Sequence, residues 1–188
     1  TYRKMVEGWQ PGKPIFLLGH SMGGLITTDY LIDHSQDFKG AVISAPAITV
    51  PDNITQMTII LGKVFSKIAP KLGVMALDAN LISKDPAVVE EYVQDPLVFH
   101  DKTTARLSAE LLKAMMRVNA EMEKITVPFI AVQGSEDQLA NPRGAKMLYE
   151  RAGSEDKTIK IFEGLFHEVF NEPEKAIVFV CLANTCCK

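Results

Sequence analysis

The sequence predicts an α/β fold with a mostly parallel sheet, and three observations lead to this prediction. Short apolar segments alternate with segments of helical periodicity along the chain, which is typical of βαβ units. The first two apolar segments are hydrophobic without interruption, as in strands covered by helices on both faces. About eighty residues separate the second predicted strand from the third, whereas a βαβ unit takes about 30, so this interval predicts an insertion.

The individual elements follow from these patterns. We predict strands over residues 15–18, 40–44, 127–133 and 157–162, and helices over residues 22–34 and 141–151. The helix over 22–34 ends at a polar cluster, as helices commonly do. A last helix is predicted to start near Glu172 and Pro173, and its apolar run 176–183 reads as a buried helix.

The chain divides into three predicted parts. Residues 1–45 hold the first strand, a turn, a helix and the second strand, and residues 126–188 hold the C-terminal part of the core. Residues 46–125 form a helical cap inserted between them. Within the cap, apolar residues at helical spacing predict helices over 54–68 and 103–123.

Composition restricts the function. Lys and Arg number 20 against 23 Asp and Glu, a net charge of −3, which argues against nucleic acid as a partner. The apolar run 176–183 is far shorter than the roughly 20 residues of a bilayer-spanning helix. The cysteines lie at positions 181, 186 and 187, too close together to link distant loops, which favours a cytoplasmic location.

The segment Gly19-His20-Ser21-Met22-Gly23 is a G-x-S-x-G motif between a predicted strand and a predicted helix. In this setting the motif forms a sharp turn, the nucleophile elbow, that lifts the serine hydroxyl clear of the sheet. The tightness of the turn predicts that Gly19 and Gly23 must lack bulk. Ser21 is therefore the predicted nucleophile, and the backbone N–H of Met22 is the predicted oxyanion donor.

A serine hydroxyl needs a base, and the base needs an orienting acid. Of the four histidines, His34 ends a helix, His100 lies in the cap, and His20 belongs to the elbow, which leaves His167 as the predicted base. Asp137, on the loop after the third strand, is the preferred acid over its neighbour Glu136. No metal-ligand cluster, phosphate loop or dinucleotide fingerprint is present in the sequence, so we expect neither metal nor cofactor.

With these motifs the sequence resembles the monoglyceride lipases and related lysophospholipases of the α/β-hydrolase superfamily. The resemblance rests on IFLLGHSMGG, ITVPFIAVQGSEDQL and KTIKIFEGLFHEVFNE, together with the cap stretch DPLVFHDKTTARLSAELL. It implies that Ser21, Asp137 and His167 are nucleophile, acid and base. It also implies a lipid ester substrate, and the cap helix with Lys63 and Lys67 beside its apolar face suggests peripheral membrane contact.

Two features depart from the family pattern. Its members have several strands before the nucleophile strand, and a loop after an early strand supplies the second oxyanion donor. Only twenty residues precede Ser21, so at about 30 residues per βα step we expect roughly a hundred residues, and the N-terminal strands, to be absent. The other departure is the cysteine-containing tail, which is read as an altered or frayed chain end in preference to an acylation site.

Several functions remain open on the sequence. The first is hydrolysis of a single-acyl lipid ester, most simply monoacylglycerol to glycerol and fatty acid; lysophospholipase or general carboxylesterase activity is its nearest alternative. A peptidase of the same superfamily is the second, and an inactive fragment the third. The cap residues predicted either to line an acyl tunnel or to form the cap's own core are Met57, Ile60, Leu61, Val64, Phe65, Met75 and Leu77.

Overall fold

A computed structural model describes residues 2–50 and 55–186 of the chain; Ile54 and Cys187 lie outside the described residues. Its centre is a four-stranded sheet of order β1-β2-β5-β6, and all three strand pairings are parallel. The strands are β1 (Phe16–His20), β2 (Gly40–Ser44), β5 (Phe129–Gly134) and β6 (Lys157–Phe162). The predicted α/β class and its four strands are confirmed.

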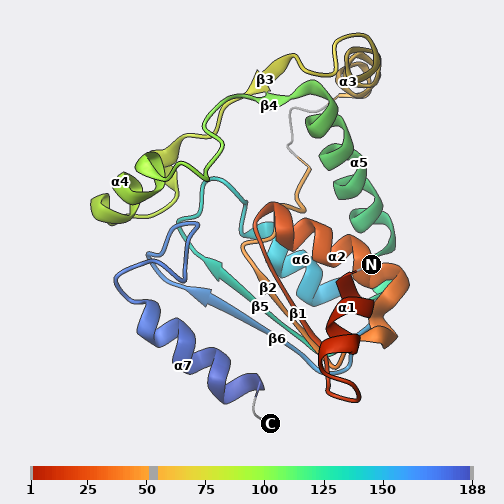
Figure 1. Ribbon diagram of the computed structural model, residues 1–188, viewed down its shortest axis with the longest axis vertical. Coiled ribbons are helices and arrows are strands. Elements are labelled where there is room, and N and C mark those ends of the chain that lie inside the picture. Colours follow the sequence, from red (N-terminus) through yellow and green to blue (C-terminus); the bar gives the residue numbers. More distant parts are fainter. Residues whose placement is uncertain (1, 51–54, 187–188) are drawn as a thin grey trace.

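Helices cover both faces of this sheet (Figure 1). On one face, α2 (Met22–His34) and α6 (Arg143–Arg151) bury Leu25, Leu31 and Leu148 against the strands. On the other face, α7 (Lys175–Cys186) contributes Val178 to a smaller cluster with Ile130 and Val132. The three helices match the predicted ones, although in α2 and α7 apolar residues occur on more than one side of the helix.

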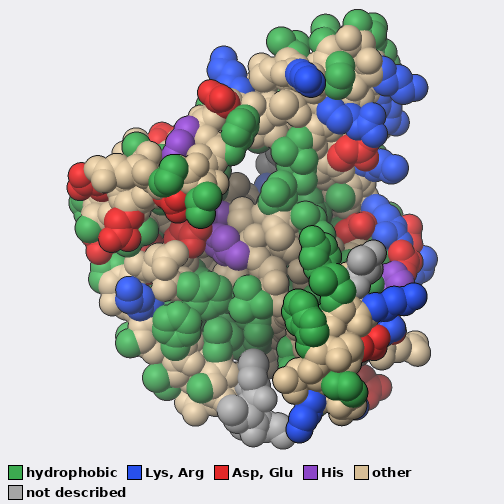
Figure 2. All heavy atoms as spheres, in the orientation of Figure 1, with side chains coloured by type: hydrophobic (Ala, Val, Ile, Leu, Met, Phe, Trp, Pro, Cys, Tyr) green, Lys and Arg blue, Asp and Glu red, His purple; other side chains and the backbone are tan. Residues whose placement is uncertain are grey.

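The prediction that 176–183 is a buried helix is wrong. Val178 is buried, but Ile177, Phe179 and Val180 are exposed. Apolar composition alone cannot tell a buried helix from a surface helix with an uncovered face. Strand β1 is similarly open, because β2 is its only partner within the described residues, and Phe16 and Leu18 are exposed along it. Figure 2 shows hydrophobic side chains gathered over α7.

Of residues 46–125, called the cap below, the part over 55–104 lies beyond the carboxyl ends of the strands, and the helix that follows it runs back alongside α2 (Figure 1). The two predicted helices are present as α3 (Gln56–Ile68), which packs against α5 (Ala105–Glu121). The sequence did not predict α4 (Pro86–Gln94), nor the short antiparallel pair of β3 (Gly73–Met75) and β4 (Thr103–Thr104). It also did not predict α1 (Tyr2–Trp9), which has no buried residue.

The alternative that the cap's apolar residues form its own core is wrong. All seven are exposed in the structure: Met57, Ile60, Leu61, Val64, Phe65, Met75 and Leu77. Helix α3 packs on α5 with one side only, so most of its apolar circumference faces outward. These side chains are therefore free to contact an apolar ligand or surface.

Candidate active site

Ser21 occupies a strained turn between β1 and α2. Its backbone has φ 55° and ψ −118°, a conformation that residues other than glycine rarely adopt. The turn is held by its N–H, which donates to the Ser44 carbonyl at 2.9 Å, and by its carbonyl, which accepts from Leu25 N at 3.1 Å and Ala47 N at 3.2 Å. The predicted strand, turn and helix thus place Ser21 at the carboxyl end of the sheet.

The two glycines of the motif are not equivalent. A Cβ at Gly19 would collide with the Thr27 hydroxyl oxygen and with the Gly23 carbonyl, so bulk is excluded there. A Cβ at Gly23 would meet no atom within 4 Å. The prediction that Gly23 must lack bulk is therefore wrong, because position 23 lies in the first turn of α2 and points into open space. Gly24, next to it, is the more confined residue, with Pro46 atoms 3.0 Å from a Cβ there.

His167 and Asp137 form a buried pair on the loops after β6 and β5. Nδ1 of His167 lies 2.7 Å from Oδ2 of Asp137, and the two residues are 3% and 5% exposed. Asp137 also accepts hydrogen bonds from Gln133 Nε2 at 2.7 Å and from the N–H groups of Leu139 and Ala140, both at 2.9 Å. Because Asp137 acts as an acceptor in its other contacts, Nδ1 of His167 is assigned as the donor in this pair, which leaves Nε2 on the other side of the ring available to act as a base.

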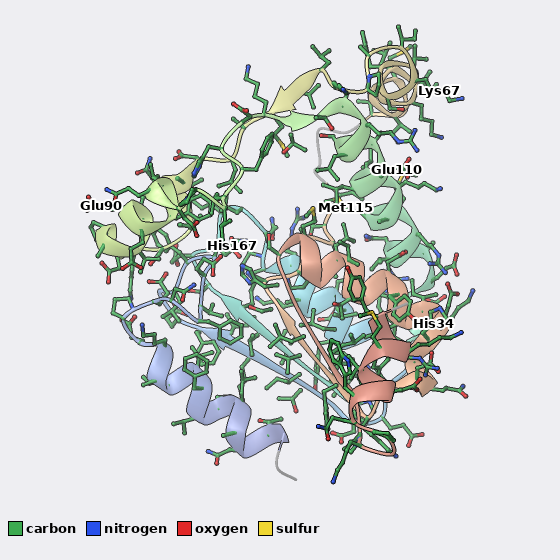
Figure 3. All side chains as sticks on the ribbon, in the orientation of Figure 1. His34, Lys67, Glu90, Glu110, Met115 and His167 are labelled. Atoms are coloured by element: carbon green, nitrogen blue, oxygen red, sulfur yellow. The ribbon has the colours of Figure 1, made fainter. Side chains whose placement is uncertain are left out.

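The competing acid and histidines lie elsewhere. The Glu136 side chain is exposed, with Oε1 3.4 Å from the neighbouring Ser135 hydroxyl. His34 stacks on Tyr30 and pairs with Asp37 at 3.3 Å, and Figure 3 shows it far from His167. His100 packs edge-on against Tyr92, with ring centroids 5.8 Å apart.

His20, which the sequence predicts only as part of the elbow, lies next to His167. The two ring centroids are 4.7 Å apart. Nδ1 of His20 lies 3.1 Å from Ser44 Oγ, and Nε2 lies 3.2 Å from Oε1 of Glu168. No sequence signal identifies these contacts, since they join β1, β2 and the loop after β6 in space.

Glu168 lies where the elbow, the histidine loop and the cap meet. Burial raises the pKa of its carboxyl, but the hydrogen bond and charge of His20 and the charge of His167 outweigh this, and the net pKa is lowered. Burial, with the charge of Glu168 added, raises the pKa of Tyr92 on α4. Tyr92 of the cap and His167 therefore both interact electrostatically with Glu168.

The surface is hollowed above this site. Figure 2 shows an opening between the part of the cap that holds α4 and the part that holds α3 and α5, and Figure 3 places His167 below it.

Among the described residues, no three His, Cys, Asp or Glu side chains gather as metal ligands. No helix among them is long and apolar enough to cross a bilayer.

A strained serine after a parallel strand, with a buried acid and histidine pair on later loops of the same sheet, is the arrangement of the α/β-hydrolase class. The chain belongs to the Hydrolase_4 family, described as serine aminopeptidase, S33, whose model matches residues 1–174.

Relatives within this class include lipases. The chain is 37% identical over 168 residues to a monoacylglycerol lipase of Mycolicibacterium smegmatis, covering 89% of this chain and 60% of the relative. It is 37% identical over 163 residues to the human monoglyceride lipase, covering 86% and 54%. The crystal structure of the Paleococcus ferrophilus monoacylglycerol lipase superposes with a TM-score of 0.84 at 32% identity, covering 97% of this chain and 72% of that one. The chain thus spans little more than half the length of these two curated relatives.

Proposed function

We propose that this protein is a serine hydrolase that cleaves carboxylic esters of single-acyl lipids, most simply monoacylglycerol to glycerol and fatty acid. The observation that carries the proposal is the buried His167–Asp137 pair at the same end of the sheet as the strained Ser21. Ser21 is the nucleophile, His167 the base and Asp137 the acid that orients it. The names of the similar lipases support the choice of substrate class.

The reaction proceeds through an acyl-enzyme. Nε2 of His167 takes the proton of the Ser21 hydroxyl as its oxygen attacks the ester carbonyl, and then returns that proton to the leaving alcohol. Water, deprotonated by the same nitrogen, attacks the acyl-serine and releases the fatty acid. The backbone N–H of Met22 is the first of α2 and has no partner within the helix, so we assign it as a donor to the developing oxyanion.

The exposed apolar residues of the cap fit a lipid substrate. The substrate is an amphiphile that resides in a membrane, so the enzyme must meet a lipid surface. Helix α3 presents Ile60 and Phe65, which are 54% and 47% exposed, on the same helix as Lys63 and Lys67. Figure 2 shows hydrophobic side chains and basic side chains next to each other over α3. This is the composition of a helix that binds reversibly to anionic membranes, and we include peripheral membrane contact in the proposal.

A second candidate is a peptidase, because the family description names an aminopeptidase. A comparison of substrates on one preparation separates the candidates. Monoacylglycerol, a lysophospholipid, a p-nitrophenyl ester and an aminoacyl amide are assayed with the wild-type chain and with Ser21→Ala. We expect ester hydrolysis, strongest on monoacylglycerol, that disappears in the variant. Dominant amide hydrolysis would favour the peptidase, and no turnover of any substrate would contradict the proposal.

A further inference from the structure

Glu172 is a charged residue that the proposed reaction does not use, and it is fully buried, with 0% of its surface exposed. Its carboxylate accepts three hydrogen bonds. Oε1 accepts from Phe166 N at 2.9 Å and from Lys84 N at 3.3 Å, and Oε2 accepts from the Ser83 hydroxyl at 3.0 Å. Burying a carboxylate costs folding free energy unless hydrogen-bond donors surround it. The segments that supply these donors are therefore held together at Glu172.

The donors come from two segments far apart in sequence. Ser83 and Lys84 belong to the cap, whereas Phe166 immediately precedes His167. A second contact joins the same segments, because the N–H of Glu168 donates to the carbonyl of Ile82 at 2.7 Å. The N–H groups of Phe166 and Glu168, the residues on either side of His167, are therefore both hydrogen-bonded. The first donates to Glu172 and the second to the cap.

We propose that Glu172 is a positioning residue for His167, which it holds in place by fastening the histidine loop to cap segment 82–84. This inference rests on the proposed function, in which His167 is the base. His167 lies on a loop between β6 and α7, outside any strand or helix, so its position depends on such contacts. Displacement of a catalytic group by about 1 Å can lower the rate by about 100-fold.

The role is geometric, so an acceptor at position 172 should suffice. In Glu172→Gln the remaining carbonyl oxygen can accept from Phe166 N and Lys84 N, while the new amide donates to the Ser83 hydroxyl, which has lone pairs to receive it. Glu172→Ala removes every acceptor at this position and leaves the partly buried N–H groups of Phe166 and Lys84 without it. Ser83→Ala removes the hydrogen bond to Glu172 and the one that Ser83 Oγ accepts from Asp85 N at 3.0 Å within the cap, and leaves the bond from Phe166 N in place.

The experiment measures hydrolysis of a soluble p-nitrophenyl ester per active site, with active sites counted by covalent titration using a fluorophosphonate. This normalisation removes the effect of misfolded protein, which a purely structural role would produce. Glu174→Ala is the matched control, because Glu174 pairs with Lys84 Nζ at 2.7 Å on the surface of the same region. We expect kcat per site to fall about 10- to 100-fold in Glu172→Ala, to fall several-fold in Ser83→Ala, and to stay near the wild-type value in Glu172→Gln and Glu174→Ala, with KM little changed.

The outcomes separate this inference from the proposed function. If the wild-type chain neither reacts with the fluorophosphonate nor hydrolyses the ester, both are overturned. If the wild type is active and Glu172→Ala keeps the wild-type kcat per site, only the positioning role is overturned. If Glu172→Ala does not fold, Ser83→Ala decides, and an unchanged kcat per site in that variant overturns the positioning role.

Discussion

The imidazole rings of His20 and His167 lie with their centroids 4.7 Å apart and their planes inclined at 52°. Since His20 directly precedes Ser21, two imidazoles and two carboxylates gather near the elbow, with Asp137 behind His167 and Glu168 beside His20. His20 also lies 3.1 Å from a second serine hydroxyl, that of Ser44. This contact joins His20 to Ser44 rather than His167 to Ser21, so the assignment of roles calls for a direct test.

Ser21→Ala is expected to abolish labelling by a fluorophosphonate probe and to lower kcat by about 10⁶-fold. The reason is that only Ser21 lies on the strained turn that exposes its hydroxyl, whereas Ser44 is fully buried. Ser44→Ala is the matched control, and this variant should still be labelled. Mass spectrometry of the labelled peptide identifies the site; label on Ser44 would move the nucleophile.

Asp137→Asn is expected to lower kcat by about 10³- to 10⁴-fold while the protein stays folded. An amide can donate to Nδ1 of His167 and so favour the wrong tautomer, with the proton on Nε2. Glu136→Gln changes the neighbouring, exposed carboxylate and should leave kcat unchanged. Steady-state kinetics of the two variants decide which carboxylate is the acid, and equal losses would contradict the assignment.

The sequence predicts Ser21, Asp137 and His167 because each follows a strand within a short recognisable segment, and the structure brings Asp137 and His167 into contact. It misses the contacts of Glu172 and of His20 because these depend on where separate loops come together. The two-residue strand β4 and its three-residue partner β3 are too short to show periodicity. The exposure of Ile177 was missed for a different reason: apolar composition does not reveal which surface remains uncovered.

Gly19→Ala and Gly23→Ala are expected to differ sharply in stability. A Cβ at position 19 meets the Gly23 backbone carbonyl, which cannot move without breaking the elbow, so the free energy of unfolding should fall by about 1–3 kcal/mol. A Cβ at position 23 enters open space within α2, where alanine is preferred over glycine by up to about 1 kcal/mol. Urea unfolding measures both changes; equal destabilisation would show that the space at position 23 is not open.

Glu168→Gln is expected to change the pH dependence of stability. The folded-state pKa of Glu168 lies below its ordinary value of 4.5, although burial alone would raise it, because His20 and His167 outweigh that effect. The folded protein therefore binds fewer protons at this site than the unfolded chain, and the contribution of Glu168 to stability is present above about pH 4.5 and lost as pH falls through the folded pKa.

Urea unfolding at pH 7 and near pH 3.5 tests this sign. The stability difference between wild type and Glu168→Gln should shrink toward the lower pH. Glu163→Gln, at an exposed position of the same loop, is the control. A difference that stays constant with pH would show that the Glu168 carboxylate is not stabilised in the folded state.

The double variant Ile60→Asp, Phe65→Asp is expected to weaken binding to anionic liposomes by about tenfold or more. Both side chains are about half exposed on α3, so their replacement removes apolar contact with the bilayer and adds repulsion from anionic lipid without opening the core. Hydrolysis of a soluble p-nitrophenyl ester should persist, because the triad residues are unchanged.

The double variant Ile177→Asp, Val180→Asp is the matched control for added charge, because both positions are exposed on α7. It should bind liposomes more strongly than the α3 variant. Co-sedimentation with liposomes and the ester assay are measured on the same preparations. If the α3 variant loses liposome binding and ester hydrolysis to the same extent, this face of α3 stabilises the fold and does not bind a lipid surface.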